Sequence, residues 1–206
     1  DTADYVNDFY SFNDRFHRMM GNLVPQANLE EMGMVSEPSY CTVATAKDNR
    51  GDDKDTTEHN IGYVAYYNKN LFDENKKVPT LLCFHGGGDS AMCMTNVSGW
   101  FQVANKYNFL LISVEHHLNS TATETVALVE HLKSKYPVDE EQIYSSGFSM
   151  GGCKSWDIFQ EYPTMVAGVA PMSATFELGL NIYGQEVGPY NQDVIVPTFY
   201  VGGEIT

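Results

Sequence analysis

The pentapeptide Gly147-Phe148-Ser149-Met150-Gly151 places a serine between two glycines, which is the pattern G-x-S-x-G. An apolar run that predicts a strand precedes it, and a segment that predicts a helix follows it. A serine in such a sharp turn exposes its hydroxyl, and glycines two residues to either side relieve the crowding of the backbone. The chemistry would be attack on a carbonyl carbon, with the Met150 N–H at the helix start stabilising the oxyanion. The alternative is that Ser149 only caps the helix.

A second glycine motif, His85-Gly86-Gly87-Gly88, follows an earlier apolar run. Glycines let a backbone approach a substrate carbonyl closely, so this loop is a source of a second oxyanion donor. We expect the N–H of Gly87 to be that donor, with Gly88 as the alternative. The two motifs, in this order along the chain, favour a catalytic Ser149 over a helix cap.

The elements that must position these motifs alternate between strands and helices. Short apolar runs bounded by glycine and proline predict strands, and apolar residues at helical spacing predict helices. Expected strands cover 40–46, 61–67, 78–84, 109–115, 142–146, 166–170 and 194–201, and expected helices cover 97–107, 123–136 and 149–162. This alternation predicts an α/β domain with a mostly parallel, doubly wound sheet. Residues 1–206 read as a single domain, with residues 1–33 as an N-terminal helical extension that packs on it.

Three other residues are candidates for the lining of a pocket. His116 and His117 end the expected strand 109–115, at the carboxyl edge where ligands bind in α/β sheets. Trp156 follows Ser149 on the expected helix and is either a pocket residue or part of the core. We expect His85 to be structural, with its imidazole bonded to the loop backbone.

The composition of this chain excludes some classes of binding partner. Its 206 residues carry a formal net charge of −15, and all three arginines lie in the first quarter, which argues against nucleic acid and favours a neutral substrate. No apolar stretch approaches the roughly 18 residues that span a bilayer. The four cysteines lack C-x-x-C spacing, so neither a metal site nor another cofactor is expected, while one or two disulfides remain open.

The stretch "DEEQIYSSGFSMGGCKSWDIFQEYPTMVAGVAPMSA", together with "HGGG" after "TLLCF", resembles the α/β-hydrolase serine esterases of the polyhydroxybutyrate depolymerase and feruloyl or acetyl xylan esterase group. The resemblance covers about residues 60–201. It implies an α/β-hydrolase fold and a carboxylesterase that forms an acyl-enzyme on Ser149. The substrate would be a feruloyl or acetyl ester of plant polysaccharide, a polyester or a small ester.

The sequence departs from that group in its acid and its histidine. In the group the order along the chain is serine, acid, histidine, yet no histidine follows His131 here. Glu204 is a weak candidate acid, because a solvated loop carboxylate is the more frequent role of such a residue. We therefore expect the C-terminal part of the fold to be missing after residue 206, and a C-terminal segment or a second chain to supply the acid and the histidine.

The rival hypothesis is a non-catalytic, hydrolase-like module that kept the glycine loops for folding and binds a carbohydrate or protein. The absent histidine favours it. The strained serine turn opposes it, because such a turn lowers stability without benefit to a protein that performs no acyl transfer. The acidic balance, the start without methionine and the resemblance to depolymerising enzymes favour a secreted or periplasmic protein.

Overall fold

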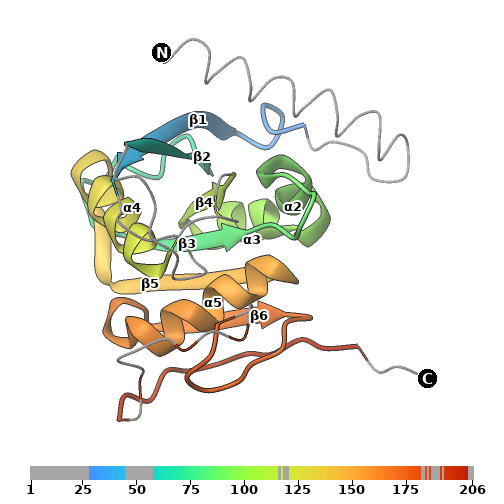
Figure 1. The fold of residues 1–206 in the computed structure, drawn as a ribbon. Helices are drawn as coiled ribbons and strands as arrows, with labels where there is room; N and C mark the ends of the chain where they lie inside the picture. The colour runs from blue at the N-terminus through green and yellow to red at the C-terminus, as the bar shows by residue number, and fades with distance from the viewer. Residues whose placement is uncertain are drawn as a thin grey trace.

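A computed structural model describes residues 28–44, 58–115, 117, 121–181, 184, 186, 191 and 193–203. These residues form one six-stranded sheet with the strand order β1-β2-β4-β3-β5-β6, which Figure 1 shows from β1 at the top to β6 at the bottom. The strands are β1 (Met34–Val43), β2 (His59–Asn68), β3 (Val78–Phe84), β4 (Leu110–Val114), β5 (Val138–Phe148) and β6 (Gly168–Met172). β1, β2 and β4 pair antiparallel, whereas β4, β3, β5 and β6 pair parallel.

Helices cover both faces of this sheet, as a mostly parallel sheet requires. They are α2 (Ala91–Ser98), α3 (Trp100–Tyr107), α4 (Ala122–Lys135) and α5 (Met150–Glu161), and a short 3-10 turn, η1 (Pro163–Met165), follows α5. Buried side chains of α4 and α5 join one core cluster, and those of α2 and α3 join another. We call the two sides of the sheet the α4/α5 face and the α2/α3 face. The predicted doubly wound α/β architecture is confirmed.

The structure corrects some predicted boundaries. The helix expected over 97–107 begins at Trp100, because Gly99 adopts φ 69° and separates α3 from α2, and most of α2 lies before the expected helix. The strand expected over 194–201 is an extended segment with bridges to β6 at Thr198 and Val201 rather than a full strand. Of the N-terminal extension expected over 1–33, only residues 28–33 are described, and they form turns.

The extended segment 194–203 nevertheless lies beside β6 in the parallel direction. Val169 N–H donates to the carbonyl of Pro197, and Phe199 N–H donates back to the carbonyl of Val169, both at 2.9 Å. Val201 N–H donates to the carbonyl of Pro171 at 3.2 Å. This segment therefore extends the sheet beyond β6 on the side remote from β1.

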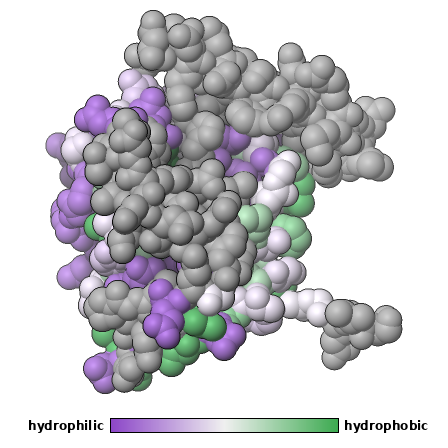
Figure 2. All heavy atoms as spheres, in the orientation of Figure 1, coloured by the Kyte–Doolittle hydropathy of each residue, from purple (hydrophilic) through white to green (hydrophobic). Residues whose placement is uncertain are grey.

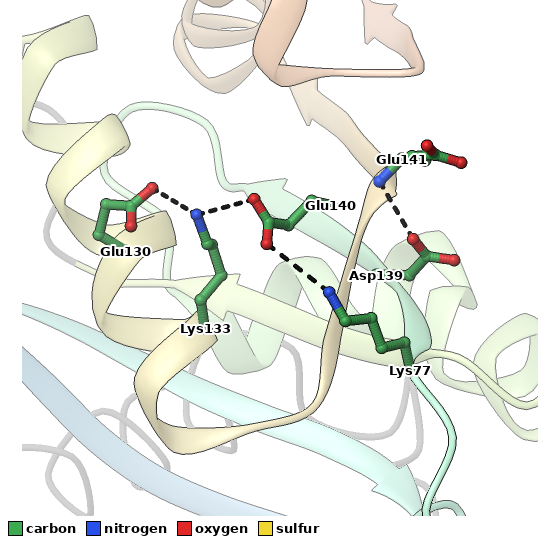
Figure 3. Close-up of polar contacts among 6 residues, drawn as sticks. All are labelled: Lys77, Glu130, Lys133, Asp139, Glu140 and Glu141. Atoms are coloured by element: carbon green, nitrogen blue, oxygen red, sulfur yellow. Dashed lines mark hydrogen bonds and ion pairs between the residues drawn. The ribbon is translucent and has the colours of Figure 1, made fainter.

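A charged surface cluster marks the start of β5. Between the pairs Val78–Val138 and Thr80–Ile143, β3 advances by two residues and β5 by five, so part of β5 bulges outward. Figure 3 shows Lys133 of α4 between Glu130 and Glu140, at 2.8 and 3.0 Å, with Lys77 on the other side of Glu140. Exposed ion pairs such as these stabilise by at most about 1 kcal/mol, so they orient the bulge more than they hold the fold.

In Figure 2, hydrophilic and hydrophobic residues occupy different parts of the visible surface. Hydrophilic residues gather on the left of the view, over α4 and the start of β5, and hydrophobic residues appear at the right and along the lower edge. Among the described residues, no helix has the length and apolar character that a membrane span needs.

Candidate active site

Ser149 stands alone between β5 and α5, in a conformation that is rare for a residue with a side chain. Its φ is 54° and its ψ is −117°. Such a backbone persists only where its surroundings impose it. Here Ser149 N–H donates to the carbonyl of Met172, at the end of β6, at 2.9 Å, and Cys153 N–H donates to the carbonyl of Ser149 at 3.1 Å. The serine side chain makes no capping hydrogen bond, so Ser149 is not an ordinary helix cap.

Three glycines around Ser149 are required by close backbone approaches. A Cβ on Gly147 would collide with the backbone of Gly151, and one on Gly151 would collide with the carbonyl of Phe84 at the end of β3. A Cβ on Gly152 would come within 2.6 Å of the Cβ of Ala174. The start of α5 is therefore pressed against the ends of β3 and β6, which sets the sharpness of the serine turn.

The glycine loop after β3 lies directly beside the serine turn. A Cβ on Gly86 would lie 3.2 Å from the ring of Phe148, and one on Gly87 would lie 2.6 Å from the sulfur of Met150. Gly88 has φ 75° in a turn that Asp89 N–H closes by donating to the carbonyl of Gly86 at 3.2 Å. The structure thus brings Gly87 and Met150, the two expected oxyanion donors, into contact.

The described histidines near this loop are engaged elsewhere. In the ring of His85, Nδ1 lies 2.6 Å from the carbonyl oxygen of Gly86 and Nε2 lies 2.7 Å from that of Glu115, which confirms its predicted structural role. The ring of His117 is fully buried, with its centroid 4.4 Å from that of His85 and 5.3 Å from that of Phe84. Two further candidates, His116 and Glu204, lie outside the described residues.

Trp156 lies on α5, two turns after Ser149, and lines a cavity of about 220 Å³. Its ring nitrogen donates to the carbonyl of Ala174 at 3.2 Å, and its ring centroid lies 4.6 Å from that of Phe176 and 6.3 Å from that of Tyr200. Trp156 thus lines this cavity and also packs against the core. The cavity is formed by α5 and by the segment that follows β6.

Below the serine turn, α5 carries a buried charged cluster that sequence reasoning missed. Lys154 and Asp157 are almost fully buried, and Glu161 lies one turn further on. Burial raises the pKa of Asp157 to about 6 and that of Glu161 to about 7, and it lowers the pKa of Lys154. The spacing i, i+3, i+7 was the available signal, since it places all three on one side of the helix.

The four cysteines are all free and do not provide a competing nucleophile. Burial raises the pKa of the Cys83 and Cys93 thiols to about 12, and it also raises the pKa of the Cys153 thiol. A thiol with a raised pKa remains protonated near neutral pH and is a poor nucleophile. Ser149 is thus the better candidate nucleophile in this region.

A larger apolar cavity, of about 450 Å³, lies away from the serine turn. It is bounded by Trp100 and Phe109 on one side and by Phe199 on the other, above Tyr144 and Gly168 of the sheet. Its lining residues Leu81 and Trp100 belong to the core cluster of α2 and α3, and Ser149 is not among the lining residues. The cavity therefore belongs to the α2/α3 face of the sheet and not to the serine site.

Comparisons with known proteins agree with this architecture. No protein-family model matches the sequence. A bifunctional acetylxylan esterase/xylanase from Neocallimastix patriciarum is 25% identical over 134 residues, which are 61% of this chain and 19% of that protein. This chain therefore spans about a fifth of the length of that relative.

Solved structures show the same fold at low sequence identity. The esterase Est22 is 13% identical with a TM-score of 0.55, and the match covers 84% of this chain and 53% of that one. A bacterial heroin esterase is 17% identical with a TM-score of 0.53, covering 85% and 53%. The esterase Pf2001 of Pyrococcus furiosus is 13% identical with a TM-score of 0.51, covering 73% and 56%. The chain has the α/β-hydrolase fold and spans little more than half of these structures.

Proposed function

We propose that this chain carries the nucleophile and the oxyanion hole of a serine carboxylesterase. The observation that carries the proposal is the backbone of Ser149, which is held at positive φ by hydrogen bonds from two sides while its hydroxyl caps nothing. Strain of this kind is found where a reactive group must be presented, and the following helix directs its N-terminus at the same point.

In the proposed reaction, Ser149 Oγ attacks the carbonyl carbon of an ester while a base accepts the hydroxyl proton. The N–H groups of Met150 and Gly87 stabilise the oxyanion, with Gly88 as the alternative to Gly87. The bond to the alcohol oxygen then breaks, the alcohol leaves with the proton, and an acyl-enzyme remains on Ser149. Water, activated by the same base, hydrolyses it and releases the acid.

We further propose that the acid and the histidine come from a C-terminal segment after residue 206 or from a second chain. Among the described residues, no hydrogen bond joins the Ser149 hydroxyl to a histidine. The ring nitrogens of His85 contact backbone carbonyl oxygens, and the ring of His117 lies against that of His85. No histidine follows His131 in these 206 residues. These observations support a base from outside the described part of the chain.

The substrate class that we propose is a carboxylic ester on plant polysaccharide, with an acetyl or a feruloyl group. The acetyl ester has the support of the acetylxylan esterase named in the comparison. A polyester is the alternative substrate. An excess of acidic residues also supports secretion, or export to a periplasm, where such polymers are met.

The proposal is tested by treating the protein with a fluorophosphonate and locating the adduct by peptide mass spectrometry. Ser149→Ala should abolish the adduct. Ser173→Ala is the matched control, because Ser173 is a nearby serine that also has a positive φ of 48°. This variant should retain the adduct on Ser149. Only an activated serine reacts quickly with this reagent.

Each outcome of the labelling has a distinct meaning. A fast adduct on Ser149 in the 206-residue chain shows that a base is already present. Labelling that appears only when the downstream coding region is included places the base there. No adduct in either form contradicts the esterase and favours the non-catalytic binding module.

A further inference from the structure

The loop between β3 and α2 holds three successive glycines at residues 86–88, yet an oxyanion hole requires donors in fixed positions. Glycine is the residue with the greatest backbone freedom, so the turn that Asp89 N–H closes on the carbonyl of Gly86 holds the loop only in part. Contacts to a neighbouring element must complete its anchoring. The end of β4 is that element, because the pairing of Phe84 with Val114 places the ends of β3 and β4 side by side.

Glu115, the residue directly after β4, holds both ends of the glycine loop. Its carbonyl oxygen lies 2.7 Å from Nε2 of His85, at the start of the loop. Its side-chain Oε2 accepts a hydrogen bond of 2.6 Å from the N–H of Ala91, where α2 begins. Its own N–H donates to the carbonyl of Gly62 on β2 at 2.7 Å, so Glu115 is itself anchored to the sheet.

The chemistry at the α2 end suits a carboxylate. The first N–H groups of a helix have no partner within the helix, and the positive end of its dipole favours a negative charge. Glu115 is 4% exposed, so water competes little for its hydrogen bond to Ala91. Ser90 completes the helix start, because its hydroxyl accepts from Cys93 N–H at 3.1 Å.

We propose that Glu115 is a positioning residue that clamps the loop of residues 85–90 and so holds the Gly87 N–H against the Met150 end of the oxyanion hole. The inference rests on the proposed esterase function. In this arrangement Glu115 does not touch the substrate. It acts through His85 at one end of the loop and through Ala91 at the other.

Three variants test the clamp. Glu115→Ala removes the acceptor, whereas Glu115→Gln keeps an oxygen that can accept from Ala91. Ala91→Pro removes the donor and adds a ring at a buried site. The first helical position tolerates proline, and the extended Ser90 before it (φ −141°, ψ 159°) is compatible with a following proline. Glu124→Gln is the control, since Glu124 is a buried glutamate of α4 outside the loop.

The readouts are the rate constant of fluorophosphonate labelling at Ser149, the apparent affinity for the reagent, and amide hydrogen exchange over residues 86–90. We expect Glu115→Ala and Ala91→Pro to slow labelling about tenfold or more with little change in affinity, because the donors act on the transition state. Exchange over residues 86–90, which keep their amide hydrogens in both variants, should rise in both. Glu115→Gln should restore most of the rate, and Glu124→Gln should resemble the wild type.

A folded Glu115→Ala protein that labels at the wild-type rate overturns the clamp alone. Equal slowing by Glu115→Ala and Glu124→Gln also overturns it, because the effect would then follow from any lost buried carboxylate. A wild-type protein that does not label in any form overturns the proposed function, and the positioning role with it.

Discussion

At Ser149, one residue combines backbone strain with a side chain that does not cap its helix, and its neighbours explain how the strain is tolerated. A positive φ in a residue with a Cβ costs on the order of 1–3 kcal/mol, which the rest of the fold must offset. The hydrogen bonds to Met172 and from Cys153 hold the turn, and Gly151 lets it close against β3. The geometry of the turn is thus a property of the packed sheet and not of Ser149 alone.

Gly151→Ala should destabilise the protein by about 3 kcal/mol or more, although alanine normally favours a helix over glycine. The reason is that its Cβ would meet the backbone carbonyl of Phe84, which cannot move without displacing β3. Gly88→Ala is the control. Its Cβ meets nothing within 4 Å, so only the φ of 75° opposes it, at about 1–2 kcal/mol.

Urea unfolding of the two variants measures the difference. Equal stabilities for Gly151→Ala and Gly88→Ala would show that α5 and β3 are not packed as closely as the structure has them.

Gly87→Ala should preserve the fold but slow the labelling of Ser149. The new Cβ would meet only the flexible side chain of Met150, which can move aside, so we expect a change in stability of about 0.5 kcal/mol. Moving the Met150 side chain disturbs the residue that supplies the other donor, so labelling should slow about tenfold or more. Adding Met150→Ala removes the collision and should recover the rate, and a failure to recover would contradict this explanation.

At the scale of elements, α5 has two functions: its start shapes the serine turn, and its body carries buried charge. Lys154 lies within reach of three acidic groups: Asp157 and Glu161 on the same helix, and Glu124 on α4. Burial raises the pKa of both acids on α5. The two acids have raised pKa values in the folded protein, so over the range from about 4 to 7 the folded state binds more protons than the unfolded state. Stability from these groups is therefore greatest at low pH and is lost as the pH rises through about 7.

Glu161→Gln should reduce this pH dependence. The pKa of Glu161 is raised to about 7, but the side chain is partly exposed and water screens its charge. We therefore expect its contribution to the free energy of unfolding to change by about 1 kcal/mol between pH 5 and pH 8. Urea unfolding at pH 5 and pH 8 measures it: the variant should gain stability over the wild type at pH 8 and not at pH 5. A constant difference between the two proteins at both values would contradict the raised pKa.

At the scale of the whole molecule, the two faces of the sheet are covered unequally. α5 packs against β5 and β6 on the α4/α5 face. On the α2/α3 face, however, Tyr144 is 38% exposed and Phe199 is 71% exposed beside the cavity of about 450 Å³. Parallel sheets are normally buried on both sides, so this part of the sheet presents an apolar surface to solvent.

This uncovered surface should bind a fluorescent apolar dye such as anilinonaphthalene sulfonate. Phe199→Asp should reduce the dye fluorescence several-fold with little change in melting temperature, because Phe199 is already exposed. Val97→Asp is the control, an exposed apolar residue of α2 outside the cavity lining. Equal fluorescence loss in both variants would show that the dye does not prefer this surface.

Most of the fold was predictable because its signals are local. The apolar runs that became β3 and β4 and the periodicity of α4 were visible in the sequence, and so were both glycine motifs. The start of α3 after Gly99 was missed because a single internal glycine is tolerated in many helices. The start of β5 at Val138 was missed because its exposed, acidic bulge has no alternating pattern.

The sequence by itself determined the α/β pattern, the serine turn and its order after a glycine loop, since each depends on residues close together in the chain. Only the tertiary structure decided which distant residues meet. It placed Gly87 against Met150, buried the rings of His85 and His117 against each other, and joined Glu115 to both ends of the glycine loop. The physical reason is that the order of strands in the sheet sets these contacts, and strand order depends on long-range pairing that no local pattern encodes.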